Sequence, residues 1–249
     1  MKVIHINESN INDINLSPNV STIGQFDGLH LGHIKLIKKC LEIKNEKNLK
    51  ASLITFNPRV DVVIHQDDVN NYLIDQDLFQ NKLKELGVDY LLIIDFNRNI
   101  SKFTHEEFFE KILNKLNIQT LIVGFDFTYG HLGKGNIHTI FDDSFKSLNP
   151  VVIDALTIDD IKVGTKEIKQ FLSNGDIINC NKFLGYNLIL KMELIDKFLY
   201  AQNLHLIKDG NYLVKINDSL ISVEINNNKL IVENYQFQDK KNIIVEFIK

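Results

Sequence analysis

Cysteine is scarce in this sequence, and long hydrophobic runs are missing. The 249 residues include only Cys40 and Cys180, with no Cys-x-x-Cys pair, which is too few for a disulfide framework. The longest purely aliphatic run, Leu91–Ile94, is far shorter than the roughly 20 residues of a membrane-spanning helix. The first residues also lack the apolar core of a signal peptide. We therefore expect a cytoplasmic protein with no membrane partner.

The sequence has no excess of positive charge. Its 28 Lys and Arg residues face 32 Asp and Glu residues, which gives a formal net charge of -4. A protein that holds a long nucleic acid needs a basic surface to neutralise phosphates, so we expect no nucleic-acid partner. Only Arg59 and Arg98 are arginines. The hydrophobic share of 44% is typical of an ordered globular chain.

Five short apolar runs recur along the first two thirds of the chain. They are centred near residues 23, 53, 92, 122 and 152. Continuous apolar runs are typical of parallel strands buried on both faces. Helical patterns lie between them, at about residues 32–45, 77–86 and 104–116. The sequence predicts an α/β fold with a doubly wound parallel sheet over residues 1–185.

The remaining residues, 186–249, have a different pattern. Alternating segments typical of β-strands replace the helical periodicity; they cover residues 187–195, 211–216, 220–225, 229–234 and 242–248. Asn226–Asn228 is a predicted hairpin turn, since Asn tolerates positive φ. We expect a small antiparallel β unit here.

Two histidines stand where the first apolar run gives way to the first helical pattern. His30 and His33 are three residues apart, so they share one face of the helix that begins there. Free N–H groups at a helix N-terminus attract phosphate, and Gly28 and Gly32 allow backbone to approach it. Two imidazole donors would then stabilise polyphosphate charge without a protein nucleophile. A metal pair and ordinary capping histidines are the alternatives, although no third metal ligand lies nearby.

Both arginines also follow apolar runs. Arg59 comes after the second run and Arg98 after the third. Ligands of an open parallel sheet bind outside the carboxyl ends of its strands. We therefore expect both arginines at that edge, where their paired N–H donors suit a phosphate.

The segment Phe26–His33 resembles the FDGxHxGH motif of bacterial FAD synthetases, the riboflavin kinase/FMN adenylyltransferase family. Thr55–Pro58 resembles the family's TFxPHP element, with Arg59 in place of the usual His. Gly124–Gly130 is similar to its VGxxFxFG loop, and Gly175-Asp176 and Leu184-Gly185 match the end of the adenylyltransferase module. The resemblance covers about residues 20–187.

The resemblance implies transfer of AMP from ATP to FMN, giving FAD and pyrophosphate, with Mg²⁺ carried by ATP. The implied catalytic residues are His30, His33 and Lys169. The implied ATP-binding residues are Gly24, Phe26, Asp27, Gly28, Gly32, Thr165 and Lys166. The implied FMN-binding residues are Phe56, Asn57, Pro58, Arg59, Arg98, Asp126, Phe127, Tyr129 and Gly130. No direct metal motif is present, and Asp126 is the candidate ligand for Mg²⁺.

Two departures from the family pattern affect these expectations. The SSTxIR signature falls on Gly164–Lys169, so Lys169 replaces Arg, keeping the charge and losing the paired donors. Residues 186–249 contain no Pro, no Thr and only one Gly, Gly210, so they lack the family's GxPTAN kinase segment. We predict no riboflavin kinase activity and a shrunken remnant of the kinase barrel. The alternatives are a non-catalytic flavin or nucleotide-binding protein, and an enzyme acting on another phosphorylated acceptor.

Overall fold

The computed structural model describes residues 1–65, 72–142, 147–196, 198–201, 203–232, 237 and 242–249. The chain forms two compact units, and each unit is made of three stretches. The first consists of Met1–Phe26, His33–Val69 and Gln80–Ala155, and the second of Asp27–Gly32, Asn70–Phe79 and Leu156–Lys249. Within the described ranges, no helix combines the length and the apolar character needed to cross a membrane.

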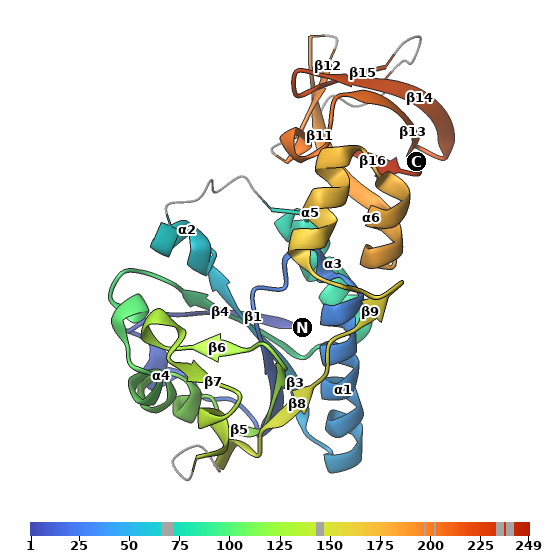
Figure 1. Cartoon of the computed structure of the whole chain (residues 1–249). Helices are drawn as coiled ribbons and strands as arrows, with labels where there is room; N and C mark the ends of the chain where they lie inside the picture. The colour runs from blue at the N-terminus through green and yellow to red at the C-terminus, as the bar shows by residue number, and fades with distance from the viewer. Residues whose placement is uncertain (66–71, 143–146, 197, 202, 233–236, 238–241) are drawn as a thin grey trace. The chain divides into compact units, whose positions relative to one another are not determined.

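A six-stranded parallel sheet forms the centre of the first unit (Figure 1). Its strand order is β1-β4-β3-β2-β5-β8. The strands are β1 (Lys2–Ile6), β2 (Asn19–Ile23), β3 (Lys50–Asn57), β4 (Tyr90–Asp95), β5 (Ile118–Gly124) and β8 (Val151–Ile153). The predicted α/β fold with a parallel sheet is confirmed.

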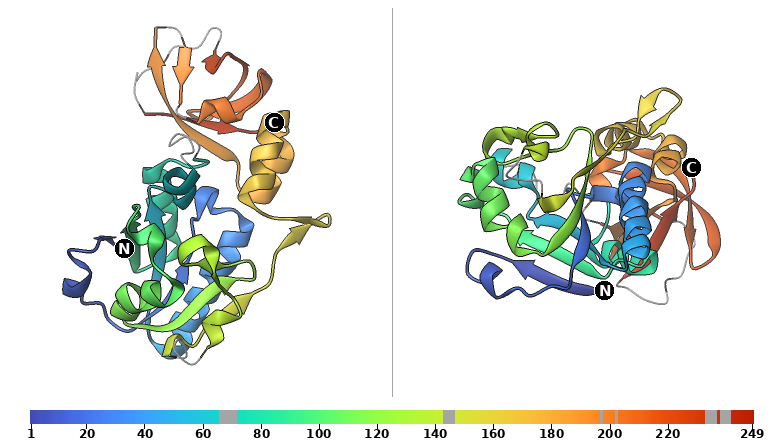
Figure 2. Two further views of the ribbon diagram at one scale, coloured as in Figure 1. Left: turned by 60° about the vertical axis from the view of Figure 1, so that its left-hand side comes forward. Right: turned by 90° about the horizontal axis from the view of Figure 1, so that it is seen from below.

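Helices lie on both faces of this sheet (Figure 2). They are α1 (Leu31–Lys47), α2 (Val60–His65), α3 (Gln76–Leu86) and α4 (His105–Lys111). Cys40 and Ile43 of α1 pack against one sheet face, together with Ile122. Phe108 and Phe109 of α4 pack in a separate core cluster on the other face. The predicted helix at 104–116 is shorter in the structure, because the chain leaves helical geometry at Ile112 and continues as a 3-10 turn.

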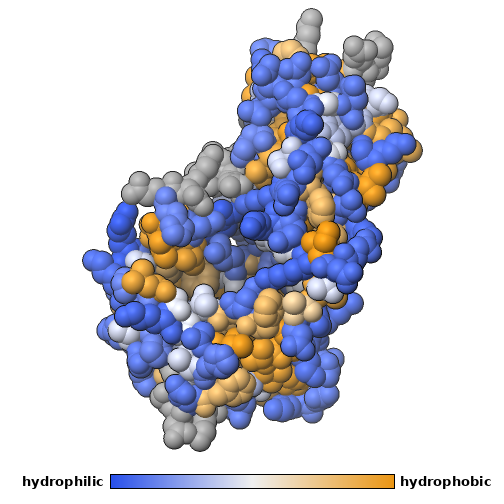
Figure 3. All heavy atoms as spheres, in the orientation of Figure 1, coloured by the Kyte–Doolittle hydropathy of each residue, from blue (hydrophilic) through white to orange (hydrophobic). Residues whose placement is uncertain are grey.

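The crossover from β5 to β8 contains a small hairpin. It consists of β6 (Thr128–Tyr129) and β7 (Gly135–Asn136), which pair antiparallel. Strand β8 is an edge strand and is only partly buried. Figure 3 shows hydrophobic side chains at the surface over β5 and β8.

The second unit contains a helix pair and a closed barrel. The helices are α5 (Thr165–Asn174) and α6 (Ile177–Leu184), and a short hairpin, β9 (Thr157–Ile158) and β10 (Ile161–Lys162), precedes them. The barrel has the order β11-β12-β15-β14-β13-β16, and all its strand pairs are antiparallel. Its strands are β11 (Leu188–Ile195), β12 (Phe198–Tyr200), β13 (Gly210–Ile216), β14 (Ser219–Asn226), β15 (Lys229–Ile231) and β16 (Ile243–Phe247).

The predicted antiparallel β unit is therefore confirmed, and it closes into a barrel. Asn227 and Asn228 have φ of +50° and +60°, as expected for the predicted turn between β14 and β15. Of the predicted segment 229–234, residues 233 and 234 lie outside the described residues.

One hydrophobic core serves the helix pair and the barrel together. Ile168 and Leu172 of α5 and Phe183 of α6 are buried in the same cluster as Leu190 and Phe247 of the barrel. Each helix ends on a glycine in the left-handed region, Gly175 and Gly185. This core makes α5, α6 and the barrel a single packing unit.

Candidate active site

The end of β2 leads into a turn with an unusual backbone. Phe26, Gly28 and Leu29 have φ of +53°, +78° and +43°. Bulky side chains rarely adopt this left-handed region, because Cβ crowds the backbone. A Cβ at Gly28 would lie 2.9 Å from Cδ1 of Leu73, so Gly28 has no room for a side chain. Such conformations concentrate at functional sites, and this turn is the first part of the candidate site.

Asp27 lies within this turn and is 5% exposed. Its Oδ1 accepts a hydrogen bond from the Leu73 N–H at 2.7 Å, and its Oδ2 lies 3.6 Å from Nζ of Lys169. The Thr165 hydroxyl donates to the Asp27 carbonyl at 3.4 Å. A buried carboxylate is costly unless it is paired and hydrogen-bonded, and the Leu73 N–H and the Lys169 ammonium offset this cost for Asp27.

Tyr186 holds the next residue of the turn. Its hydroxyl donates a hydrogen bond to the Gly28 carbonyl. Burial is the main cause that raises the pKa of Tyr186, with smaller contributions from Cys180 and Asp27. The hydroxyl therefore keeps its proton and remains a donor throughout the physiological pH range.

His30 follows the turn directly and precedes the first residue of α1. It is 5% exposed. A Cβ at Gly32 would lie 3.1 Å from Cε1 and Nδ1 of the His30 ring and 3.3 Å from the Val163 carbonyl. Gly32 therefore leaves room for the His30 ring.

His33 lies in the first turn of α1 and belongs to the first unit. Its ring centroid is 5.0 Å from that of Phe26, and the rings are tilted by 56°. Phe26 is fully buried, and Gly24, between it and β2, donates its N–H to the Ile54 carbonyl at 3.1 Å. The sheet therefore fixes the position of Phe26, the aromatic ring against which His33 packs.

The N-terminus of α5 is a candidate anion-binding group in the second unit. Gly164 occupies the N-cap position with no side-chain hydrogen bond, and Thr165 and Lys166 follow it. Lys166 is exposed, whereas Thr165 is half-buried against Asp27. Backbone N–H groups and lysines at a helix start attract phosphate.

The carboxyl end of β3 carries four of the predicted FMN-binding residues. Phe56 packs edge-on against Phe96 with ring centroids 5.6 Å apart, and the Asn57–Pro58 peptide bond is cis. Arg59 is 3% exposed and donates to both carboxylate oxygens of Asp61, at 3.0 and 2.6 Å. The paired donors of Arg59 are thus directed at Asp61.

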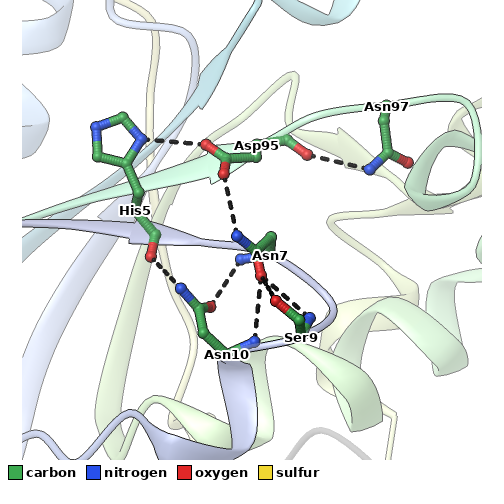
Figure 4. Close-up of polar contacts among 6 residues, drawn as sticks. All are labelled: His5, Asn7, Ser9, Asn10, Asp95 and Asn97. Carbon is green, nitrogen blue, oxygen red and sulfur yellow. Dashed lines mark hydrogen bonds and ion pairs between the residues drawn. The ribbon is translucent and has the colours of Figure 1, made fainter.

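Asp95, at the carboxyl end of β4, is the centre of a polar cluster (Figure 4). His5 Nδ1 lies 3.1 Å from one of its carboxylate oxygens, and the Asn7 amide donates to the other at 3.4 Å. Arg98 lies three residues further along and is exposed. Sequence reasoning did not single out His5, although Asp95 directly follows an apolar run.

The loop from β5 to β6 carries the last group of predicted residues. Phe127 and Tyr129 stack on each other, with centroids 5.3 Å apart and planes at 12°. Tyr129 is 6% exposed and its hydroxyl lies 3.3 Å from that of Thr139. Gly130 has φ of +72°, and a Cβ there would lie 2.6 Å from the backbone nitrogen of His105. The backbone therefore requires glycine at this position.

Asp126 is the candidate for contact with Mg²⁺. It is exposed, and its Oδ1 would lie 3.2 Å from a Cβ built at Gly124, so the carboxylate points back toward the end of β5. No group of three or more His, Cys, Asp or Glu side chains suited to a metal occurs in the described part of the chain. One carboxylate fits Mg²⁺ that keeps several waters and is bound mainly by substrate phosphates.

The second unit thus brings Asp27, Gly28, Thr165 and Lys169 together, and the first carries the predicted FMN-binding residues. Sequence reasoning missed Leu73, Tyr186 and Asp61, which contact predicted site residues. The only feature of the sequence that could have indicated Tyr186 is its position directly after the Leu184-Gly185 element.

Comparison with known proteins places these features in context. The sequence profile described as FAD synthetase matches residues 13–167. The bifunctional riboflavin kinase/FMN adenylyltransferase of Bacillus subtilis (strain 168) is 33% identical over 194 residues, or 77% of this chain. The alignment spans 61% of that protein, less than two thirds of its length. An FAD synthetase of Listeria monocytogenes is 25% identical, over 71% of this chain and 74% of that protein.

A solved structure is similar over the whole chain. A macrolide-efflux protein from Streptococcus pneumoniae has a TM-score of 0.83, covering 98% of this chain and 97% of that one. Its sequence identity is 20%, so this likeness shows the fold alone.

Proposed function

The chain belongs to the FAD synthetase family, and on this premise we propose that it transfers AMP from ATP to FMN. The products are FAD and pyrophosphate. The observation that carries the proposal is the buried His30 at the start of α1, preceded by a strained turn that belongs to the matched FAD synthetase region.

The reaction requires no protein nucleophile. An oxygen of the FMN phosphate attacks the α-phosphorus of ATP, the bond from that phosphorus to the oxygen bridging the β-phosphate breaks, and pyrophosphate leaves with the bond's electron pair. The FMN phosphate is already ionised at neutral pH. Catalysis therefore consists of positioning the substrates and stabilising charge.

The proposed ATP-binding residues divide this work. His30 and His33 donate to phosphate oxygens and stabilise the charge that grows on the leaving pyrophosphate. Thr165, Lys166 and the N–H groups of α5 bind phosphate, and Lys169 adds positive charge beside the Asp27 carboxylate. Gly24, Gly28 and Gly32 leave space for close approach.

The FMN-binding residues are proposed from the strand ends of the first unit. Arg98 is exposed and suits the FMN phosphate, whereas Arg59 acts with Asp61 to shape the end of β3. Phe56, Phe127 and Tyr129 provide aromatic surface for the flavin. Asn57, Pro58 and Gly130 determine the backbone conformation around the proposed flavin site. Asp126 would hold Mg²⁺, which neutralises phosphate charge when bound.

We further propose that this chain has no riboflavin kinase activity. A loop that brings backbone close to a triphosphate needs glycines. Residues 186–249 contain a single glycine, Gly210, which begins β13 of the barrel. The barrel core is filled by its own side chains and by α5 and α6.

The proposal is tested by incubating the pure protein with ATP, Mg²⁺ and FMN and quantifying FAD and pyrophosphate. We expect both products in equal amounts, and no FMN when riboflavin replaces FMN. Binding of ATP and FMN without FAD formation would favour a non-catalytic protein. Pyrophosphate release with a different phosphorylated acceptor, but not with FMN, would show another nucleotidylyltransferase. Formation of FMN from riboflavin would show that the protein has riboflavin kinase activity and would contradict this part of the proposal.

A further inference from the structure

The turn before His30 is strained and needs external support. Phe26, Gly28 and Leu29 all have positive φ within four residues. Such conformations persist only when the surrounding structure enforces them. Gly28 and Leu29 are buried, so their backbone groups require partners within the protein.

Tyr186 supplies the partner of the Gly28 carbonyl. That carbonyl belongs to the peptide unit joining Gly28 to Leu29, and Leu29 immediately precedes His30. The orientation of this peptide determines the direction in which the chain enters His30. Loss of the Tyr186 hydroxyl would leave a buried carbonyl without this donor, which favours rotation of the peptide.

We propose that Tyr186 is a positioning residue that holds the His30 imidazole in place through the Gly28 carbonyl. This inference rests on the proposed adenylyltransferase function. Tyr186 lies beyond the region that matches the FAD synthetase profile, so this role belongs to the C-terminal part of the chain. The hydroxyl keeps its proton for this hydrogen bond, because burial raises the pKa of Tyr186.

The structure offers a matched control. Tyr212, at barrel strand β13 in the same unit, also donates its hydroxyl to a backbone carbonyl, that of Lys208, at 2.6 Å. Tyr186→Phe and Tyr212→Phe therefore remove the same kind of hydrogen bond. Only the first variant alters the turn before His30.

Two measurements test the role of Tyr186. In the first, Tyr186→Phe should lower kcat for FAD formation by about ten- to a hundredfold, with KM for ATP within about twofold of the original. In the second, hydrogen exchange of the unliganded protein should show a loss of protection in residues 27–32. Tyr212→Phe should leave kcat and this exchange unchanged, even if its Tm falls.

The exchange measurement separates this inference from the proposed function. If the unaltered protein makes no FAD, the proposed function fails, but protection of residues 27–32 still reports on Tyr186. Unchanged exchange in Tyr186→Phe overturns the inference. A proportional rise in KM without a fall in kcat also overturns it, as does an equal effect of Tyr212→Phe or a Tyr186→Phe chain that fails to fold.

Discussion

His30 and His33 differ in their surroundings although only two residues separate them. His30 is 5% exposed and follows the strained turn, whereas His33 is half-buried and packs on Phe26. Burial lowers the local dielectric and strengthens the interaction of a donor with phosphate charge. His30 is therefore expected to contribute more than His33.

Replacing either histidine by Ala should lower kcat by roughly a hundredfold or more, because its donors meet charge that develops in the transition state. The apparent affinity for ATP should change far less. Steady-state kinetics of FAD formation measure both quantities. His138→Ala, at an exposed position, serves as the control. Weaker ATP binding with full turnover would contradict this assignment.

Lys169 joins a buried carboxylate to the N-terminal half of α5. Lys169→Arg should keep or raise activity, since Arg retains the charge near Asp27 and adds paired donors. Lys169→Ala should lower both activity and Tm, because it removes the cation beside the buried Asp27 carboxylate. Lys191→Ala, which breaks a more exposed pair with Asp77, is the control. Unchanged kinetics in Lys169→Ala would show that this side chain plays no part in the reaction.

Residue identity predicted some of these contacts and not others. The His-x-Gly-His spacing and the strand-end arginines indicate phosphate chemistry because their donors suit it. Tyr186 and Leu73 carry no such signal, since a tyrosine hydroxyl and a backbone N–H can bond to almost any acceptor. Their partners, Gly28 and Asp27, lie 158 and 46 positions away in the sequence. Only the folded chain shows such pairings.

At the scale of elements, the carboxylate of Asp89 connects β3, β4 and α1 at the amino ends of the strands. Asp89, just before β4, accepts the Ala51 N–H of β3 at 2.8 Å and contacts Lys44 Nζ of α1 at 2.7 Å. Burial opposes its ionisation, but these hydrogen bonds and the charges of Lys44 and Lys50 hold the pKa of Asp89 below its ordinary value.

Asp89→Asn should therefore destabilise the protein by about 1–2 kcal/mol at neutral pH. Because the folded pKa is lowered, this stabilisation is present above the ordinary pKa of about 4 and is lost as pH falls through the folded value. Denaturant-induced unfolding at several pH values measures the free energy of unfolding. The difference in this free energy between Asp89→Asn and the unaltered protein should shrink below pH 4. The control is Asp218→Asn at an exposed pair. A difference independent of pH would contradict this account.

The inner strands of the sheet and the edge strand β8 were predictable from their apolar residues, whereas the edge strand β1 and the short strand β12 were not. Strands β3, β4 and β5 are rich in apolar residues, whereas β2 is buried although it includes Ser21 and Thr22. Strand β1 lies at the sheet edge with mostly exposed residues, so its short pattern gave no signal. Strand β12 has only three residues and depends on its barrel neighbours.

For the whole molecule, the core shared by α5, α6 and the barrel predicts the effect of truncation. A chain ending at residue 185 would expose Ile168, Leu172, Phe183 and Leu184, which are at most 1% exposed in the full chain. Burial of such side chains contributes about 1.5–3 kcal/mol each. We expect the truncated chain to aggregate or to lose cooperative unfolding. Size-exclusion chromatography and circular dichroism test this, and a monomer with unchanged helix content and Tm would contradict it.

The interleaving of the two units has a consequence for synthesis on the ribosome. Residues 27–32 leave the exit tunnel early, but their partners in the second unit include Thr165, Lys169 and Tyr186. The intervening chain of more than 130 residues must be made before these contacts can form, and contacts so distant in sequence form slowly. The nascent chain can therefore pair β1 to β5 while the segment before His30 is still unrestrained. The turn acquires its final geometry only when translation is nearly finished.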